Sequence, residues 1–168
     1  IILCAGNHDV NLKIRDSIFS SIFDIKDHKA AVNLFDKLYH EPKKDLLAHL
    51  SDYNDFASTI VNIPLENKIF FTKSITINNH NIGIASLNTS WLTKGGGQAD
   101  YGNLFLTERQ IERAYDEIKD YPLKIAVFHH TFDWLNQNEK QIIKNRLGEK
   151  FNIVLCGHNH ENTAEAIS

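Results

Sequence analysis

The sequence has little of several things that would mark a specialised class of protein. It contains no methionine, three prolines and two cysteines in 168 residues. No apolar run approaches the roughly 20 residues that a membrane-spanning helix needs, so we expect no membrane partner. A net charge of −3 is not typical of a protein that binds nucleic acid through its overall charge, although it does not exclude a local basic patch.

The few cysteines and the start of the chain also carry information. Cys4 and Cys156 both lie at the ends of apolar segments. We interpret them as two buried thiols of a protein in a reducing, cytoplasmic compartment. The alternative is a disulfide between the two cysteines, if the two segments are neighbouring strands. The chain begins inside an apolar segment at Ile1 with no preceding turn, which predicts that it is part of a longer protein.

What the sequence does contain fits one globular domain. Hydrophobic residues make up 42% and charged residues 23%, both near the average for globular proteins, and the length suffices for one core. From residue 11 to about 63, apolar residues recur at three- and four-residue spacing, which predicts helices. We interpret this region as a helical insert within the domain.

The pattern changes to strands after this region. Segments 69–77 and 82–90 are rich in β-branched residues and flank the Asn-rich stretch 78–81, which predicts a β-hairpin. The apolar segments 123–130 and 151–156 predict two further buried strands, and the first four residues of the chain read in the same way.

Helices are predicted between these strands. The sequence Thr-Glu-Arg-Gln from Thr107 is typical of a capping box, and Asn136 is typical of a second helix start, with Gly148 as its expected end. Strands that alternate with helices and are almost entirely apolar indicate an α/β fold with a layered core.

Five of the nine histidines follow the apolar segments. These are His8, His129, His130, His158 and His160. Ligands bind at the carboxyl ends of strands in α/β sheets, so we expect these side chains to converge. Imidazoles beside amide or carboxylate oxygens, here Asn7 and Asp9, suit a metal such as Zn, Mn or Fe. His158 and His160, which follow Gly157, could bind one metal ion or two adjacent ions.

Three of these motifs occur in the order of a known family. GNHD at 6–9, HH at 129–130 and GHNH at 157–160 each follow an apolar segment. Together they resemble the calcineurin-like metallophosphoesterases, and HHTFDWL (129–135) and LNTSW (87–91) are similar to segments of some bacterial members. The resemblance implies two packed mixed β-sheets flanked by helices. Residues 1–168 would be the C-terminal portion of one such domain.

The resemblance also implies a metal site. Asn7, His129 and His158 would bind one divalent ion and His160 the other, with Mn favoured over Fe or Zn. The family's D-x-H and G-D-x-x-D motifs, which supply the remaining ligands, would precede Ile1. This chain alone is therefore expected to be inactive, and its first partner would be the rest of its own domain, with further domains possible in the longer protein.

The remaining implied roles concern the reaction. His8 would protonate the leaving-group oxygen and Asp9 would orient His8, while His130 stays open between a supporting and a substrate-facing role. The implied reaction is hydrolysis of a phosphoester, preferably a phosphodiester of a nucleotide or nucleic acid, by a hydroxide between the two metals. Thr131 replaces the proline of the family's H-H-P form and removes no ligand. The alternative is a non-catalytic regulatory or scaffolding module, or a sensor domain, in a larger protein.

Other notable residues have ordinary structural interpretations. Trp91 and Trp134 are expected to pack near the site. The glycine-rich segment 93–103 is interpreted as a mobile surface loop, with a substrate lid as the alternative. The remaining histidines are expected on the surface. They are His28, His40, His49 and His80.

Overall fold

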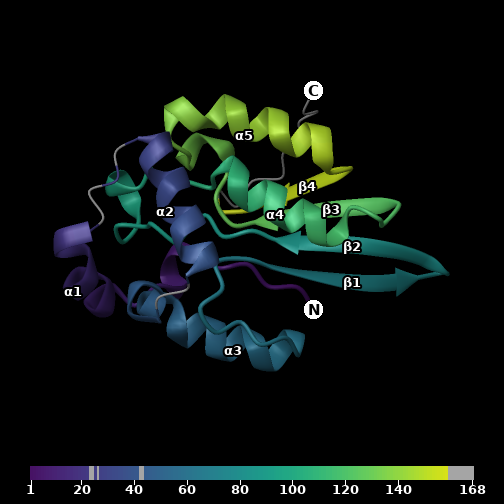
Figure 1. Ribbon diagram of the computed structural model, residues 1–168, viewed down its shortest axis with the longest axis horizontal. Helices are drawn as coiled ribbons and strands as arrows, with labels where there is room; N and C mark the ends of the chain where they lie inside the picture. The colour runs from purple at the N-terminus through teal and green to yellow at the C-terminus, as the bar shows by residue number, and fades with distance from the viewer. Residues whose placement is uncertain (23–24, 26, 42–43, 159–168) are drawn as a thin grey trace.

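The computed structural model describes residues 1–22, 25, 27–41 and 44–158 (Figure 1). The α-helices within these ranges are α1 (Leu12–Ile22), α2 (His28–His40), α3 (Ser51–Val61), α4 (Glu108–Ile118) and α5 (Gln137–Lys150). The strands are β1 (Phe71–Ile77), β2 (His80–Ser86), β3 (Leu123–Phe128) and β4 (Ile153–Cys156). Short 3-10 helices are η1 (Asn7–Asp9), η2 (Lys44–Leu50), η3 (Gly97–Ala99) and η4 (Phe132–Trp134).

The strands form one mixed sheet in the order β1-β2-β3-β4. β1 and β2 are antiparallel, whereas β2, β3 and β4 are mutually parallel neighbours. Figure 1 shows α4 and α5 on one side of this sheet and α3 on the other. The predicted α/β class is confirmed. The second sheet of the expected two-sheet fold does not occur among the described residues.

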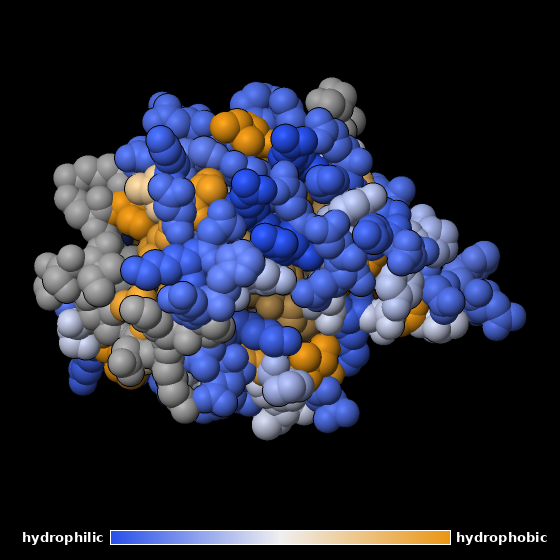
Figure 2. Space-filling model, viewed as in Figure 1, coloured by the Kyte–Doolittle hydropathy of each residue, from blue (hydrophilic) through white to orange (hydrophobic). Residues whose placement is uncertain are grey.

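The main core lies between the sheet and the helices α2, α4 and α5. Ala85, Ala126 and Phe128 of the sheet are almost fully buried, and so are Ile111 of α4 and Ile143 of α5. α4 places its apolar stripe on β1 and β2, and α2 and α5 pack against α4. On the face shown in Figure 2, polar residues cover most of the surface and apolar residues appear only in small separate areas.

The described residues between 12 and 61 are mostly helical, as their periodicity predicts. α2 begins where the Asp27 carboxylate accepts the Ala30 N–H at 2.9 Å, which is a regular N-cap. It buries Ala31, Phe35 and Leu38, which lie on one face of the helix. No helix in the described part of the chain combines the length and apolar character that a bilayer crossing requires.

The predicted hairpin is confirmed, with a turn shorter than the Asn-rich stretch. Ile77 pairs with His80, so only Asn78 and Asn79 form the turn. Both have positive φ, 48° and 64°, as a type I′ turn requires. Asparagine tolerates this conformation better than other non-glycine residues, and the turn fixes the register of β1 on β2.

Three predicted features of the strands and helices are wrong. Residues 1–4 form no strand; Leu3 instead packs against the cluster around Phe71, and its carbonyl accepts the Ser86 hydroxyl. β4 is exposed rather than buried, because no described element covers the face that carries Ile153 and Leu155, which are 43% and 51% exposed. Gly148 does not end α5, which continues to Lys150 and is closed by the Phe151 N–H on the Leu147 carbonyl.

The capping box predicted at Thr107 forms only in half. The Thr107 hydroxyl accepts the Gln110 N–H at 3.3 Å, as a cap does. The Gln110 side chain does not return to Thr107; its carbonyl accepts the Asn88 N–H at 2.6 Å and its amide donates to the Asn88 carbonyl at 3.2 Å. Gln110 therefore ties α4 to the segment that leaves β2.

Two of the four histidines expected on the surface are not there. His40 and His80 are exposed. His49 is buried, with Nε2 2.9 Å from the Trp91 carbonyl oxygen, and burial lowers its pKa. His28 is half-buried between two carboxylates, those of Glu108 and Glu139. Both join the helical region to the α/β part.

No disulfide joins the two cysteines in the described part of the chain, and only one of them is shielded. Cys4 is half-buried, and burial followed by the Asp9 charge raises its pKa to about 11. Cys156, the last residue of β4, is exposed. The expectation of two buried thiols is therefore wrong for Cys156.

Candidate metal centre

Three of the predicted site histidines meet where two neighbouring strands end. His129 and His130 follow β3, and His158 follows β4. The two strands are parallel, with Phe128 opposite Cys156, and the Gly157 N–H donates to the His129 carbonyl at 3.0 Å. One candidate ligand atom from each of the three histidines lies within 4.8 Å of the others. The parallel pairing is the reason that residues almost 30 positions apart become neighbours.

His129 and His158 are in direct contact. His129 Nε2 lies 2.9 Å from His158 Nδ1, so one imidazole N–H donates to the lone pair of the other. His158 has a positive φ of 73°, which turns its side chain out of the strand direction. The Trp134 ring meets the His158 ring edge to face at 4.2 Å between centroids. The expectation that Trp134 packs near the site is confirmed.

His130 lies behind this pair and is completely buried. Its Nδ1 is 2.8 Å from the Thr89 hydroxyl, which also accepts the His130 backbone N–H at 3.3 Å. Burial, followed by the neighbouring His129 and His158, lowers the pKa of His130 to about 3. The imidazole is therefore neutral at physiological pH. Its Nε2 is buried and has no hydrogen-bond partner among the residues described.

The GNHD motif reaches the same place from the other end of the chain. Gly6 packs on the His129 ring so closely that a Cβ would lie 3.1 Å from His129 Cε1. The next residue, Asn7, is buried at 9% exposure and begins η1. Within the described ranges, Asn7 Oδ1 is a buried acceptor that no donor satisfies. A buried acceptor without a donor is costly and rare in proteins unless a ligand supplies the missing contact.

The other residues of the motif point to the surface. His8 and Asp9 are both exposed. The Asp9 carboxylate accepts the Gly6 N–H at 2.9 Å and so closes the η1 turn; no hydrogen bond joins it to His8 in the described part of the chain. His160 lies outside the described residues.

The described residues fit a divalent metal. Two ring nitrogens on one tetrahedral ion, with bonds of about 2.0–2.1 Å, lie about 3.3–3.4 Å apart. The separation of 2.9 Å between His129 Nε2 and His158 Nδ1 needs only a small adjustment to reach that value. Neutral imidazole and an amide oxygen form a donor set suited to Mn, Fe or Zn. Asn7, His129 and His158 would hold such an ion, and one ring nitrogen of His130 lies close enough to the other two histidines to be a further ligand.

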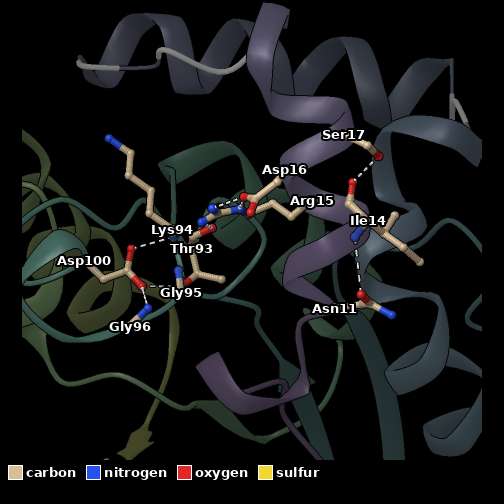
Figure 3. A network of polar contacts seen from close by, with 10 residues as sticks. All are labelled: Asn11, Ile14, Arg15, Asp16, Ser17, Thr93, Lys94, Gly95, Gly96 and Asp100. Carbon is tan, nitrogen blue, oxygen red and sulfur yellow. Dashed lines mark hydrogen bonds and ion pairs between the residues drawn. The ribbon is translucent and has the colours of Figure 1, made fainter.

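The glycine-rich loop is more ordered than its composition predicts (Figure 3). Asp100 is 1% exposed, and its carboxylate accepts the Thr93 hydroxyl and the N–H groups of Lys94 and Gly96. The Arg15 guanidinium donates to the Thr93 carbonyl at 3.3 Å and so ties α1 to the loop. Residues 94, 95 and 97–99 are exposed, as expected of a surface loop, and the buried aspartate ties the loop backbone together.

Sequence analysis missed three contributors to the site. They are Thr89, Gly96 and Asp100. Thr89 lies in the LNTSW segment, whose resemblance to family members was noted without a role for the hydroxyl. Asp100 follows three glycines at a distance that allows a side chain to satisfy turn N–H groups, and this signal was available. The approach of Gly96 to Asn7 depends on tertiary packing alone.

One comparison with known proteins supports the resemblance. The chain is 25% identical over 170 residues to the uncharacterized metallophosphoesterase-like protein YydB of Bacillus subtilis, an alignment that covers 96% of this chain and 33% of that protein. The chain therefore spans about a third of the length of this relative. No family model matches the chain, and no solved structure matches it significantly.

Proposed function

We propose that this chain forms part of a metal-dependent phosphoester hydrolase. The observation that carries the proposal is the contact of His129 with His158 where β3 and β4 end, with Gly6 packed on the His129 ring and the acceptor of the next residue, Asn7, buried and unsatisfied by the described residues. The similarity of nearly the whole chain to a metallophosphoesterase-like protein supports the same class. In this proposal Asn7, His129 and His158 hold one divalent ion, and His160 is a ligand of a second.

The residues of this chain have separate tasks in the proposed reaction. The bound ions would supply Lewis acidity toward the phosphoryl oxygens and a nucleophilic hydroxide near neutral pH. His8, exposed beside the buried Asn7, would give its proton to the leaving oxygen as the P–O bond breaks. Gly6 presses against the His129 ring, and Thr89 fixes the His130 ring, so the ligand side chains are held before substrate arrives.

The rest of the site would come from further residues of the same protein. We propose that they add the remaining metal ligands and a second sheet, as in the two-sheet fold that the motifs imply. One sheet face supports this arrangement. Ile125 pairs with Ile153 and Val127 with Leu155, and the two β4 residues are 43% and 51% exposed. A sheet of this kind is normally covered on both faces.

We favour a phosphodiester, of a nucleotide or nucleic acid, as the substrate. The basis is the resemblance of the HHTFDWL stretch to that of bacterial phosphoesterases, so it is an analogy rather than site chemistry. The net charge of −3 argues mildly against long DNA as the substrate.

Hydrolysis of bis-p-nitrophenyl phosphate by the full-length protein with Mn²⁺ tests the proposal. We expect activity in the wild type. His8→Ala should lose about 100-fold or more on a dinucleotide, whose alkoxide leaving group needs a proton, and much less on bis-p-nitrophenyl phosphate, whose p-nitrophenolate leaves without one. His80→Ala, an exposed histidine on the hairpin, is the matched control and should keep full activity. A panel of phosphomonoesters, cyclic nucleotides and single-stranded DNA would then assign the substrate class. No hydrolysis of any member would favour the non-catalytic alternative.

A further inference from the structure

We infer that the glycine-rich loop 93–100 positions the metal ligand Asn7, with Gly96 as the contact residue and Asp100 as the anchor. The inference rests on the proposed function, because it takes Asn7 as a ligand. It assigns a purpose to the glycines, which otherwise read as a flexible surface segment. Gly96 and Asp100 touch neither metal nor substrate and act through Asn7.

The contact between Gly96 and Asn7 leaves no room for a side chain. A Cβ on Gly96 would lie 2.9 Å from Asn7 Nδ2 and 3.8 Å from Asn7 Cγ. The Gly96 backbone, with φ 87° and ψ −175°, adopts a conformation that other residues rarely reach. The loop backbone therefore forms a wall on the Nδ2 side of the Asn7 amide. The buried oxygen Oδ1 is the other polar atom of the same amide.

Asp100 holds the loop backbone that forms this wall in place. Its carboxylate binds the Gly96 N–H at 2.5 Å and the Lys94 N–H at 2.6 Å, and it also accepts the Thr93 hydroxyl. Three groups of the loop thus converge on one side chain that is 1% exposed (Figure 3). Charge-assisted hydrogen bonds of a buried carboxylate are the stronger kind. Three consecutive glycines that are free of such an anchor would sample many conformations.

A side-chain amide can rotate about its last torsion, and only one of its two polar atoms is a metal ligand. The wall on the Nδ2 side restricts that rotation, so Oδ1 is aligned before the ion binds. Residues that orient metal ligands typically contribute about 10–100-fold to metal affinity. We expect Gly96→Ala to displace the Asn7 amide, since that is the atom group nearest the new methyl, and to lower Mn²⁺ affinity by about this factor.

The test compares Mn²⁺ affinity, by competition with a fluorescent chelator, in the full-length protein and its variants. Gly97→Ala is the control for loop disturbance, because φ is also positive there (64°) and nothing lies within 4 Å of its Cβ position. Its affinity should stay within about 3-fold of wild type. The double variant with Gly96→Ala and Asn7→Ala separates the positioning of Asn7 from backbone strain in the loop. Gly96→Ala strains the loop backbone in both backgrounds, but it can displace the Asn7 amide only where Asn7 is present.

Asp100→Asn keeps the shape of the anchor and removes its charge, so it should weaken Mn²⁺ binding less than Asp100→Ala does. The inference predicts that Gly96→Ala weakens binding in the wild-type background and adds almost nothing to Asn7→Ala. Equal effects of Gly96→Ala in both backgrounds, or equal effects of Gly96→Ala and Gly97→Ala, would overturn it.

A second readout works without any metal. In metal-free protein labelled with ¹⁵N-asparagine, the Asn7 side-chain amide signal is assigned by its loss in Asn7→Ala. It should move in Gly96→Ala and stay in place in Gly97→Ala. If the protein binds no Mn²⁺ at all, the proposed function fails while this readout still decides whether the loop fixes Asn7. An Asn7 amide signal that is unchanged in Gly96→Ala contradicts the inference.

Discussion

Substitution of His28 tests how the helical region is attached to the α/β part of the fold. It begins α2 and lies between two carboxylates, with Nε2 2.8 Å from a Glu108 oxygen and Nδ1 3.0 Å from a Glu139 oxygen. The hydrogen bond with Glu139 is the main cause that raises the pKa of His28. Burial raises the pKa of Glu139, against the opposing effect of its bonds with His28 and the Leu106 N–H.

The size of the effect of His28→Ala follows from burial. The Glu139 side chain is fully buried, and a buried hydrogen bond to a charged group is worth about 1.5–3 kcal/mol. The Glu108 side chain is 22% exposed, so the energy of its ion pair with His28 is expected nearer to that of surface ion pairs, about 0–1 kcal/mol. We therefore expect His28→Ala to lower the free energy of unfolding by roughly 2–3 kcal/mol where His28 is charged.

The effect must also depend on pH with a defined sign. A histidine whose pKa is raised by folding stabilises the protein fully below its unfolded pKa, about 6.5, and the contribution is lost as pH rises through the folded pKa. Urea unfolding at about pH 6 and about pH 9 should therefore show a larger wild-type advantage over His28→Ala at the lower pH. His80→Ala, an exposed histidine, is the matched control and should show no advantage at either pH. An equal advantage at both values would refute this account of the junction.

Three further outcomes are expected elsewhere in the fold. Gly83→Ala should cost about 1–3 kcal/mol in urea unfolding, because a Cβ there would lie 2.8 Å from Ile118 Cβ at the interface of β2 and α4. Asn79→Gly should raise the free energy of unfolding by about 0.5 kcal/mol, since glycine adopts the positive φ of the hairpin turn without strain. A thiol reagent such as Ellman's reagent at neutral pH should modify Cys156 quickly and Cys4 only on unfolding, because Cys156 is exposed and the pKa of Cys4 is raised to about 11. A lower midpoint for Asn79→Gly, no change for Gly83→Ala, or equal rates at the two thiols would each contradict the corresponding expectation.

Local sequence signals were sufficient for most of the secondary structure. The hairpin follows from β-branched runs around two asparagines, and α2 and α5 from a capping residue followed by apolar spacing. The errors occur where the environment decides. β4 has the composition of a buried strand and is exposed because no described element covers the face that carries Ile153 and Leu155.

The meeting of the site histidines could be predicted from the order of the strands. Placing His129 and His158 after neighbouring parallel strands is enough to bring them into contact. The supporting contact of Thr89 with His130, over 41 positions, was not predictable, and neither was the contact of Glu139 with His28 at the start of α2, over 111 positions. Contacts of that separation are set by packing of the whole chain and leave no periodic trace in the sequence.

The most direct test of the central claim is the Mn²⁺ affinity of four single variants, measured by chelator competition in the full-length protein. Removing a ligand, in Asn7→Ala, His129→Ala or His158→Ala, should weaken binding by about 100-fold or more, beyond the range expected for a residue behind the ligands. His8→Ala should keep wild-type affinity, because His8 is exposed and is proposed to act on the leaving group. If His8→Ala lost the metal as fully as His158→Ala, or if all four variants bound Mn²⁺ as the wild type does, the site proposed here would be wrong.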